Sequence, residues 1–270
     1  MDNVPLGKPV EYPAEYAPDV LCAIPRAESR SALGLFDDLP FRGEDIWNAW
    51  ELTWLAATGT PVVGTAAIRI NADSPNLIES KSLKLYLNSL AMTRYASADE
   101  LTTIIASDLS RTAGLDVDVS VTPTADSTAA TIGQLPGECI DTVDIGDVPT
   151  KVDAAVLATA AGPAVTEELF SHLLRSNCPV TNQPDSGSVM IRYRGRKINR
   201  QALLTYIVSF RQHNDFHEGC VERMFVDIKK CCKPSALTVY ARFNRRGGLD
   251  INPFRSDFED SMENLRLWRQ

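Results

Sequence analysis

The sequence predicts an α+β fold in which a module of two strands, two helices and two strands occurs twice. In the second half of the chain, a period-2 alternation of apolar residues changes to a helical period and then back again. The first half shows a degenerate copy of the same order. Elements in this order form antiparallel sheets with the helices on one face. We therefore expect two such modules in tandem.

The elements of the first half are marked by periodicity and by a helix cap. The leucines of 79–87 alternate with Lys84 and Tyr86, the pattern of a half-buried strand. Ser97 and Glu100 have the spacing of a capping box, and an amphipathic helix behind them stops at Gly114. In order, we expect a strand within 50–70, a strand over 79–87, this helix, and a strand over 117–121.

The elements of the second half are more regular. One helix carries apolar residues at i, i+3, i+4, i+7 and i+11 from Val221 and is ended by Pro234. Gly247 and Gly248 predict a turn. In order, we expect a strand over 189–193, helices over 203–210 and 221–232, a strand over 239–243, and an extended segment over 249–254.

The composition is that of a globular protein and excludes several classes. The 270 residues are 44% hydrophobic and 23% charged, which excludes a mostly disordered chain. No apolar stretch approaches the roughly 20 residues of a membrane-spanning helix. The start of the chain has neither the basic residues nor the apolar core of a secretory signal. We therefore expect a cytoplasmic protein with no membrane partner.

Charge and cysteine usage narrow the partners further. The net charge of −8 argues against a dedicated nucleic-acid binder, so no nucleic-acid partner is expected. A local basic pocket for a phosphorylated small molecule is compatible with this balance. The six cysteines form no C-x-x-C pair, which in a reducing compartment indicates free thiols. No metal site is expected.

Changes in composition divide the chain into three parts. Residues 1–45 are rich in proline and are expected to form an irregular arm that packs on the core. Residues 123–165 hold much Thr, Ala, Gly and Pro, so a boundary is placed near their end. We therefore expect modules over 46–165 and 166–270. No Gly-x-Gly-x-x-Gly follows a strand, so a Rossmann cofactor site is not supported.

The first candidate site opens with Glu79, Ser80 and Lys81. Mixed charges of this kind also occur on solvated strand edges. A carboxylate beside ammonium groups at the entrance of a strand can instead hold a polar heterocycle and a phosphate.

The second candidate site runs from Ser176 to Asp185 and contains Cys178. A free cysteine is most often a small buried hydrophobe. Cys178 differs because it lies in a polar stretch bounded by prolines, with a carboxylate seven residues further on. An aspartate at the far side of such a turn could take the proton of the thiol and later return it, and the thiolate is the nucleophile.

The third candidate site contains His213, His217 and Glu218. Two histidines at i and i+4 resemble half of a zinc site, and Cys220 lies three residues beyond. The His-Glu-x-x-His order of a metalloprotease is absent. Polar residues at a helix junction and substrate binding by His217 and Glu218 are the other interpretations, and the residues alone do not choose among the three.

A fourth basic segment stands out in this acidic chain. Arg242, Arg245 and Arg246 precede Gly247 and Gly248. A surface loop is one interpretation. The other is a site for a nucleotide phosphate, where a guanidinium binds in bidentate fashion and glycine lets the backbone approach.

Taken together, these segments resemble the NADPH-dependent 7-cyano-7-deazaguanine reductases, the nitrile reductases of queuosine biosynthesis. The similar blocks are 79–86, 176–185, 213–222 and 245–255, in family-like order over nearly the whole chain. The order resembles the two-module form, with the signature in the first module and the cysteine in the second. The resemblance implies the tunnelling fold, whose subunits join into barrels, so a homodimer is expected.

The resemblance also implies a reaction. Cys178 would add to the nitrile carbon of 7-cyano-7-deazaguanine to give a covalent thioimide, and two NADPH would reduce it to 7-aminomethyl-7-deazaguanine. Asp185 would activate the thiol and donate a proton, and His217 would assist. The implied substrate-binding residues are Ile78, Glu79, Ser80, His217 and Glu218. The implied NADPH-binding residues are Ser80, Lys81, Arg246 and Gly247.

Two alternatives stay open. The tunnelling fold also contains type I GTP cyclohydrolases, which would use zinc with Cys178, His213 or His217 as ligands; a second well-spaced cysteine near these histidines is lacking. A purine- or pterin-binding protein without turnover is the other, and it predicts that Cys178→Ala leaves the biological role intact.

Overall fold

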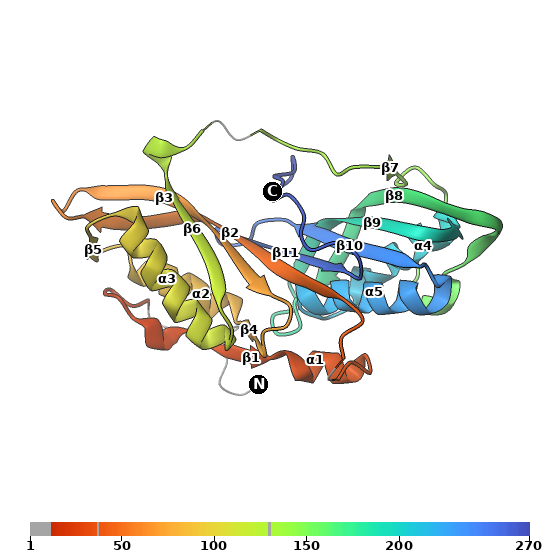
Figure 1. Cartoon of the computed structure of the whole chain (residues 1–270), viewed down its shortest axis with the longest axis horizontal. Helices are drawn as coiled ribbons and strands as arrows, with labels where there is room; N and C mark the ends of the chain where they lie inside the picture. The colour runs from red at the N-terminus through yellow and green to blue at the C-terminus, as the bar shows by residue number, and fades with distance from the viewer. Residues whose placement is uncertain (1–11, 37, 129–130) are drawn as a thin grey trace. The chain divides into compact units, whose positions relative to one another are not determined.

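The computed structural model describes residues 12–36, 38–128 and 131–270, which form two compact units (Figure 1). The first unit contains the chain up to Ser29, Asp45–Thr131 and Arg245–Ile251. The second unit contains Arg30–Glu44, Ile132–Asn244 and Asn252–Gln270. Each unit is thus assembled from separate segments of the chain. The division of the chain into two consecutive modules, 46–165 and 166–270, stays a prediction.

The first unit holds strands in the order β6-β3-β2. Its elements are β2 (Arg42–Ala56, mostly in this unit), β3 (Pro61–Asn71), α2 (Ser80–Ser89), α3 (Ala98–Ala113) and β6 (Val117–Pro123). β3 and β6 are antiparallel, with Ile70 opposite Val117. β1 (Ala23–Pro25) and β4 (Asn76–Ile78) form a separate antiparallel pair, and β5 (Arg94–Tyr95) runs parallel to β2. Both α2 and α3 lie along one face of the three long strands (Figure 1).

Helix α2 replaces the strand that was predicted over 79–87, so that prediction was wrong. The carboxylate of Glu79 accepts hydrogen bonds from the backbone N–H groups of Lys81 and Ser82 and begins the helix there. Leu83, Tyr86 and other apolar residues of this short segment also satisfy the spacing i, i+3, i+4, and these two are fully buried. A ten-residue window therefore fits both periods, and the cap decides between them.

Of the other predictions for the first unit, the helix behind Ser97 is confirmed and the strand within 50–70 is corrected. Ser97 accepts the N–H of Glu100 (3.1 Å) at the start of α3, and Gly114 ends the helix with φ of 78°. The strand predicted within 50–70 is in fact two strands, β2 and β3, because the turn around Gly59 (φ 89°) separates them.

The second unit has the order of two strands, two helices and two strands that was expected of the module, although only the second of its first two strands was placed in the sequence. These are β8 (Thr159–Asn177), β9 (Pro184–Ile198), α4 (Arg200–Val208), α5 (His217–Cys232), β10 (Ala236–Phe243) and β11 (Leu249–Ser256, shared with the first unit). The strand order is β11-β10-β9-β8-β7, with β7 (Glu138–Cys139) parallel to β8 and the other pairs antiparallel. The second unit therefore has the strand–strand–helix–helix–strand–strand order of the expected α+β tunnelling fold, whereas the first unit has two long strands, two helices and one further long strand.

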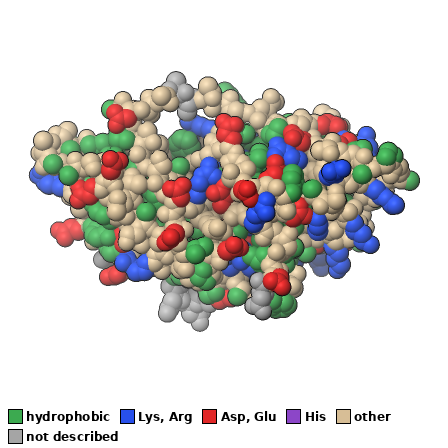
Figure 2. Space-filling model, viewed as in Figure 1, with side chains coloured by type: hydrophobic (Ala, Val, Ile, Leu, Met, Phe, Trp, Pro, Cys, Tyr) green, Lys and Arg blue, Asp and Glu red, His purple; other side chains and the backbone are tan. Residues whose placement is uncertain are grey.

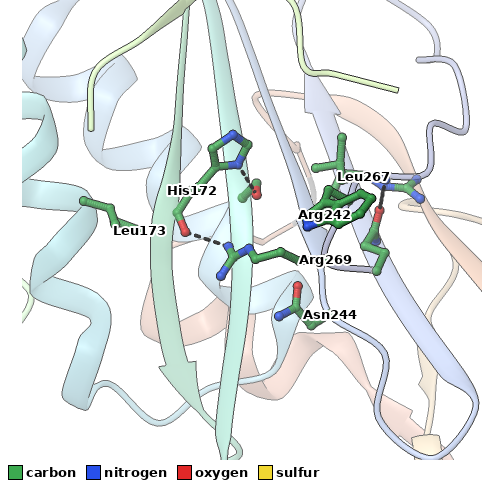
Figure 3. A pocket seen from close by; sticks show the side chains of 9 residues that line it. His172, Leu173, Arg242, Asn244, Leu267 and Arg269 are labelled. Atoms are coloured by element: carbon green, nitrogen blue, oxygen red, sulfur yellow. Dashed lines mark hydrogen bonds between the residues drawn. The ribbon is translucent and has the colours of Figure 1, made fainter. Parts of the chain in front are cut away.

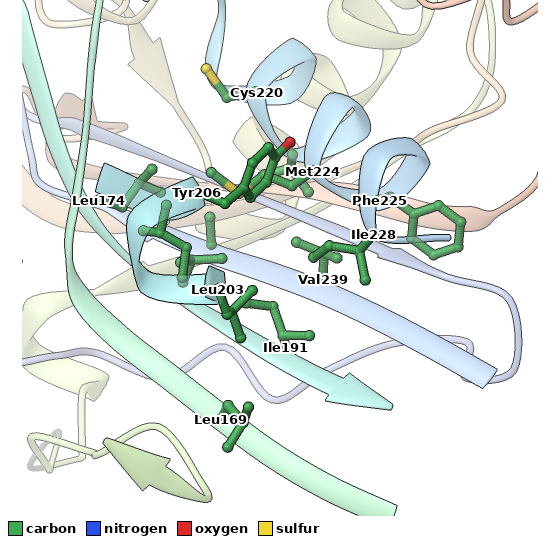
Figure 4. Packing of buried hydrophobic residues seen from close by; sticks show 14 of the residues in the cluster. Leu169, Leu174, Ile191, Leu203, Tyr206, Cys220, Met224, Phe225, Ile228 and Val239 are labelled. Atoms are coloured by element: carbon green, nitrogen blue, oxygen red, sulfur yellow. The ribbon is translucent and has the colours of Figure 1, made fainter. Parts of the chain in front are cut away.

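The core of the second unit lies between its strands and its helices. Apolar side chains of α4 and α5 meet those of β8, β9 and β10 (Figure 4). Strand β8 was not recognised in the sequence. Its first half is largely exposed and shows no alternation, so its periodicity carries no signal.

The N-terminal segment is more regular than the predicted irregular arm. After the short 3-10 helix η1 (Pro18–Val20) come β1 and helix α1 (Arg26–Ala32). Buried ion pairs anchor α1: Arg26 binds Asp45 (2.6 Å) in the first unit, and Arg30 binds Glu222 (2.7 Å) in the second. Residues 1–11 of the predicted arm lie outside the described residues.

The remaining short elements are the 3-10 helices η2 (Thr124–Asp126), η3 (Ala154–Val156) and η4 (Ser209–Gln212). On the face shown in Figure 2, acidic and basic side chains are interspersed. Within the described ranges, none of the helices is long and apolar enough to cross a membrane.

Candidate active site

The loop between β8 and β9 holds Cys178 in a buried and closed turn. The N–H of Cys178 donates to the carbonyl of Gln183 (2.9 Å), and the N–H of Asn182 donates to the carbonyl of Cys178 (3.0 Å). Asn182 has φ of 55°, a left-handed conformation that asparagine tolerates. The cysteine is only 3% exposed. Backbone hydrogen bonds on both sides of it therefore fix its position.

Asp185 lies on the same hairpin as Cys178. In the β8–β9 register it is directly opposite Ser176. Cys178 directly follows the last residue of β8, Asn177, so Cys178 and Asp185 lie at the same end of the hairpin. Asp185 is buried as well. The turn end of this hairpin thus carries both a buried cysteine and a buried carboxylate.

The segment before α5 is hydrogen-bonded to the end of β8. The N–H of Asn177 donates to the carbonyl of His213 (2.8 Å), and the N–H of Asp215 donates to the carbonyl of Asn177 (3.1 Å). The side chain of Asn214 donates to Oδ1 of Asn182 in the loop (3.0 Å). The second and third sequence motifs therefore form a single site in the second unit.

His217 is the first residue of α5 and faces Asp185. Its Nε2 lies 3.5 Å from Oδ2 of Asp185, and its ring stacks on Phe243 with the centroids 3.9 Å apart. The Nδ1 atom is buried and has no hydrogen-bond partner among the described residues. Glu218 follows in the first turn of α5, buried, where the helix dipole favours a negative charge. One ring nitrogen thus faces the carboxylate and the other is left for a ligand.

Phe243 is a site residue that the sequence did not reveal. It is the last residue of β10 and alternates with other apolar residues, so the pattern shows only a buried strand. The stacking joins positions 26 residues apart, and no local signal predicts it.

The zinc interpretation of His213 and His217 gains no support from their surroundings. Nε2 of His213 lies 3.5 Å from Oδ2 of Asp215, whereas His217 faces Asp185. Burial raises the pKa of Cys220 well above its ordinary value, which disfavours the thiolate that zinc binds. In the part of the chain that is described, no three or more His, Cys, Asp or Glu side chains are grouped to hold a metal ion.

In the first unit, Glu79 is held rigidly at the start of α2. Its Oε1 accepts the N–H of Lys81 (2.7 Å) and its Oε2 accepts the N–H of Ser82 (2.8 Å). A carboxylate has about four acceptor positions, so a ligand can still donate to it. The side chain is 1% exposed, and Ile78 at the end of β4 is also buried.

Comparison with known proteins agrees with these motifs. Residues 12–121 match a family described as "Nitrile reductase, 7-cyano-7-deazaguanine-reductase N-term", and residues 184–261 match "QueF-like protein". The NADPH-dependent 7-cyano-7-deazaguanine reductase of Desulfotalea psychrophila is 50% identical, over 99% of this chain and 98% of its own length. The chain belongs to the 7-cyano-7-deazaguanine reductase family. Its members are nitrile reductases, and the named relatives depend on NADPH.

Two further similarities were found. The reductase of Dechloromonas aromatica, which has the same name, is 53% identical over 93% of this chain and 89% of its own length. A crystal structure of the archaeosine synthase QueF-Like in the apo form is 17% identical, with a TM-score of 0.32 over 37% of this chain and 98% of that one.

The four residues that the family resemblance predicts for the nucleotide cofactor, Ser80, Lys81, Arg246 and Gly247, all belong to the first unit. Ser80 and Lys81 form the first turn of α2. Gly247 has φ of 61°, and a Cβ atom on it would lie 3.1 Å from Cε of Lys84, one turn further along α2. The turn at Arg246 is closed by its N–H, which donates to the carbonyl of Leu249 (2.9 Å).

A pocket of about 270 Å³ lies beside this turn. It is lined by Tyr12, Ala49, Glu51, Thr53, Lys84, Leu87, Asn88, Gly247, Gly248 and Leu249. Arg245 lies over the ring of Trp50, 5.4 Å from its centroid. Gly247 and Gly248 expose the backbone beside the ammonium group of Lys84, which suits a phosphate, although Glu51 also lines the pocket. Of the four predicted cofactor residues, Gly247 lines this pocket, and Ser80, Lys81 and Arg246 do not. The sequence suggested that Arg242 belongs to this basic turn. That grouping was wrong, because Arg242 is buried within β10 in the second unit.

Proposed function

We propose that this chain catalyses the NADPH-dependent, four-electron reduction of 7-cyano-7-deazaguanine to 7-aminomethyl-7-deazaguanine, a step of queuosine biosynthesis. The observation that carries the proposal is the hairpin of the second unit, whose turn end carries both Cys178 and Asp185, with His217 facing Asp185. Membership of the nitrile reductase family supplies the substrate class.

The reaction begins with the thiol. Asp185 accepts the proton of Cys178, and the thiolate then adds to the nitrile carbon. A carbon–sulfur bond forms, one π bond of the nitrile breaks, and the nitrogen takes the proton back from Asp185. The product is a covalent thioimide, which accepts a hydride more readily than a nitrile does. When bound, NADPH supplies the hydride ions, one for each of two reduction steps.

The second reduction needs a second proton transfer at the same place. After the first hydride has reached the carbon, the carbon–sulfur bond breaks and Cys178 leaves as a thiolate, which gives an imine. His217 lies 3.5 Å from Asp185 and would share a proton with it. The imine carbon would accept the second hydride and its nitrogen this shared proton, which gives the primary amine. The Cys178 thiolate would then regain a proton from solvent. The ring of Phe243 holds the imidazole in one plane during both transfers.

Substrate recognition follows from the buried acids. In the proposal, Glu79 accepts hydrogen bonds from the guanine-like N–H groups, with Ile78 and Ser80 beside it. In the second unit, the proposal assigns base recognition to Glu218 and to the Nδ1 atom of His217. Because unpaired buried carboxylates are costly, bases that lack these N–H donors should bind poorly.

The cofactor is assigned to Ser80, Lys81, Arg246 and Gly247 of the first unit. A 2′-phosphate would explain why this region is basic in a chain of net charge −8. Since the mechanism needs a reduced thiol, the proposal places the enzyme in the cytoplasm. We also propose a homodimer, which sedimentation of the purified chain would test.

The proposal is tested by trapping the covalent intermediate. Protein is mixed with 7-cyano-7-deazaguanine without NADPH, and the intact mass is recorded. We expect one adduct of the mass of the nitrile on the unmodified chain, none on Cys178→Ala, and a normal amount on Cys139→Ala, which removes an exposed cysteine. With NADPH present, about two cofactors should be consumed per nitrile. An adduct that persists in Cys178→Ala would overturn the assignment of the nucleophile.

A further inference from the structure

A second pocket, of about 350 Å³, lies in the second unit beside an irregularity of β8 (Figure 3). The β8–β9 register shifts between Ser171 and Leu174, which leaves His172 and Leu173 in a β-bulge. Bulges re-aim side chains and occur often beside functional sites. Both bulge residues line the pocket, and neither takes part in the proposed reaction.

The pocket contains a buried positive charge without a negative partner. Arg242 is 1% exposed, and its guanidinium donates to Oε1 of Gln270 (3.0 Å), the hydroxyl of Tyr240 (2.8 Å) and Oδ1 of Asn264 (2.8 Å). All three acceptors are neutral. Among the ion pairs of the described residues, none includes Arg242. A buried charge is normally paired, because leaving it unpaired costs several kcal/mol.

A second cation lines the same pocket. The guanidinium of Arg269 donates to the carbonyl of His172 (2.7 Å) and to that of Gly187 (3.1 Å), and Figure 3 shows the first of these bonds. These acceptors are neutral too, and no described carboxylate pairs with Arg269. The pocket therefore brings together two guanidinium groups, and no Asp or Glu lines it.

The other lining residues complete a site for an organic anion. Nδ1 of His172 is hydrogen-bonded to the hydroxyl of Ser188 (2.7 Å), which leaves its Nε2 for another partner. Asn244 adds an amide to the polar side. Leu267 and Trp268 form an apolar wall, and the Trp268 side chain is 82% exposed. Such a ring is free to pack against an apolar or aromatic group of a ligand.

We propose that this pocket binds a small phosphate ester. Its phosphate faces Arg242 and Arg269, and its organic part packs on Leu267 and Trp268. A phosphate monoester carries close to two negative charges at neutral pH, which matches two guanidinium groups that lack carboxylate partners. The inference stands apart from the reductase activity, because none of these residues belongs to the proposed catalytic or cofactor sites.

Titration calorimetry of the full chain with inorganic phosphate and with phenyl phosphate tests this proposal. We expect phenyl phosphate to bind more tightly than phosphate. Arg269→Gln, an exposed position that should leave the fold intact, is expected to weaken both ligands by about tenfold or more. Trp268→Ala should weaken phenyl phosphate alone. Arg242→Gln should abolish binding of both ligands. If that variant does not fold, the loss of affinity in Arg269→Gln is the test of the proposal.

Two control variants separate this pocket from other phosphate sites. Arg196→Gln removes an exposed arginine from β9 of the same unit and should leave both affinities unchanged. Arg246→Gln alters the candidate cofactor site and should also leave them unchanged. Loss of binding in Arg246→Gln with full binding in Arg269→Gln would move the phosphate to the cofactor site and overturn the proposal. Equal affinities in the unmodified chain and Arg269→Gln would overturn it as well. Neither result depends on whether the chain reduces a nitrile.

Discussion

The imidazole of His217 and the phenyl ring of Phe243 are stacked almost in parallel, 3.9 Å apart with an angle of 6° between their planes. Both backbone polar groups of Phe243 are hydrogen-bonded to side chains. Its N–H donates to Oδ1 of Asn252 (3.2 Å), and its carbonyl accepts the amide of Gln270 (2.8 Å). The orientation of the histidine thus depends on a residue whose backbone cannot easily move.

Phe243→Leu should impair catalysis more than folding. Leucine fills much of the same space but offers no flat ring, so the imidazole can rotate away from Asp185. We expect kcat to fall by about tenfold, with a small change in the affinity for the nitrile. Phe254→Leu is the matched control, because Phe254 is equally buried but packs on Tyr240. Equal losses of kcat in both variants would show that the stacking has no special role.

Gly247→Ala should weaken NADPH binding. The residue has a left-handed φ of 61°, and the added methyl group would press on Lys84. Gly146 has a similar φ of 66° but nothing within 4 Å of its Cβ position, so Gly146→Ala reproduces the backbone strain alone. We expect each variant to lose about 1 kcal/mol of stability. Only Gly247→Ala should raise the dissociation constant for NADPH, measured by fluorescence titration, and a rise in neither would contradict the cofactor assignment.

Glu222→Gln should destabilise the helix that carries His217 and Glu218. The carboxylate binds Arg30 (2.7 Å) and Arg255 (2.8 Å), and all three side chains are almost fully buried. Removing the negative charge from a buried network costs about 3–5 kcal/mol, which urea unfolding measures. Glu168→Gln removes the partly exposed partner of Arg192 and should cost less than about 1 kcal/mol. Similar costs for both substitutions would refute the importance of the network.

Arg200→Gln should lower the free energy of unfolding more at neutral pH than in acid. Hydrogen bonds from Arg200 lower the pKa of Glu167 and also that of Glu138. A carboxyl group whose pKa is lower in the folded state stabilises the fold above its unfolded pKa of about 4.3. That stabilisation disappears as the pH falls through the lowered folded value.

Unfolding by urea at several pH values between 7 and 3 checks this expectation. The unmodified chain should be more stable than Arg200→Gln by about 1 kcal/mol at pH 7, with the difference shrinking once the pH falls below about 4. Arg196→Gln, at an exposed position on β9, should show no such trend. A difference that stays constant with pH would mean that the carboxylates do not account for it.

Much of the second unit could be predicted from the sequence because its periods are long and uninterrupted. The helix from Val221 to Cys232 and the strand ending at Phe243 repeat their patterns over several turns or residues. The strand predicted over 79–87 failed because ten residues satisfy both periods, and the capping role of Glu79 is decided by backbone geometry. Strand β8 escaped because its first half is exposed on both faces.

The sequence showed the polar motifs of the candidate site. It did not show the hydrogen bonds and the ring stacking that hold these motifs in place. Cys178, Asp185 and His217 stand in distinctive polar segments, which drew attention to them. The hydrogen bonds of Asn177 to the segment before α5 join two of those segments, and they involve only backbone atoms. Phe243 contributes through stacking across the sequence, which leaves no local pattern.

The cap formed by Glu79 has a consequence for selectivity. Its two oxygens are already fixed by the backbone of α2, so the carboxylate does not need to lose rotational freedom when a ligand arrives. A receptor that is ordered in advance discriminates by geometry, since it cannot adjust to donors spaced differently. Glu79 should therefore act as a rigid template, and shortening it to aspartate would disturb both the start of the helix and the reading of the base.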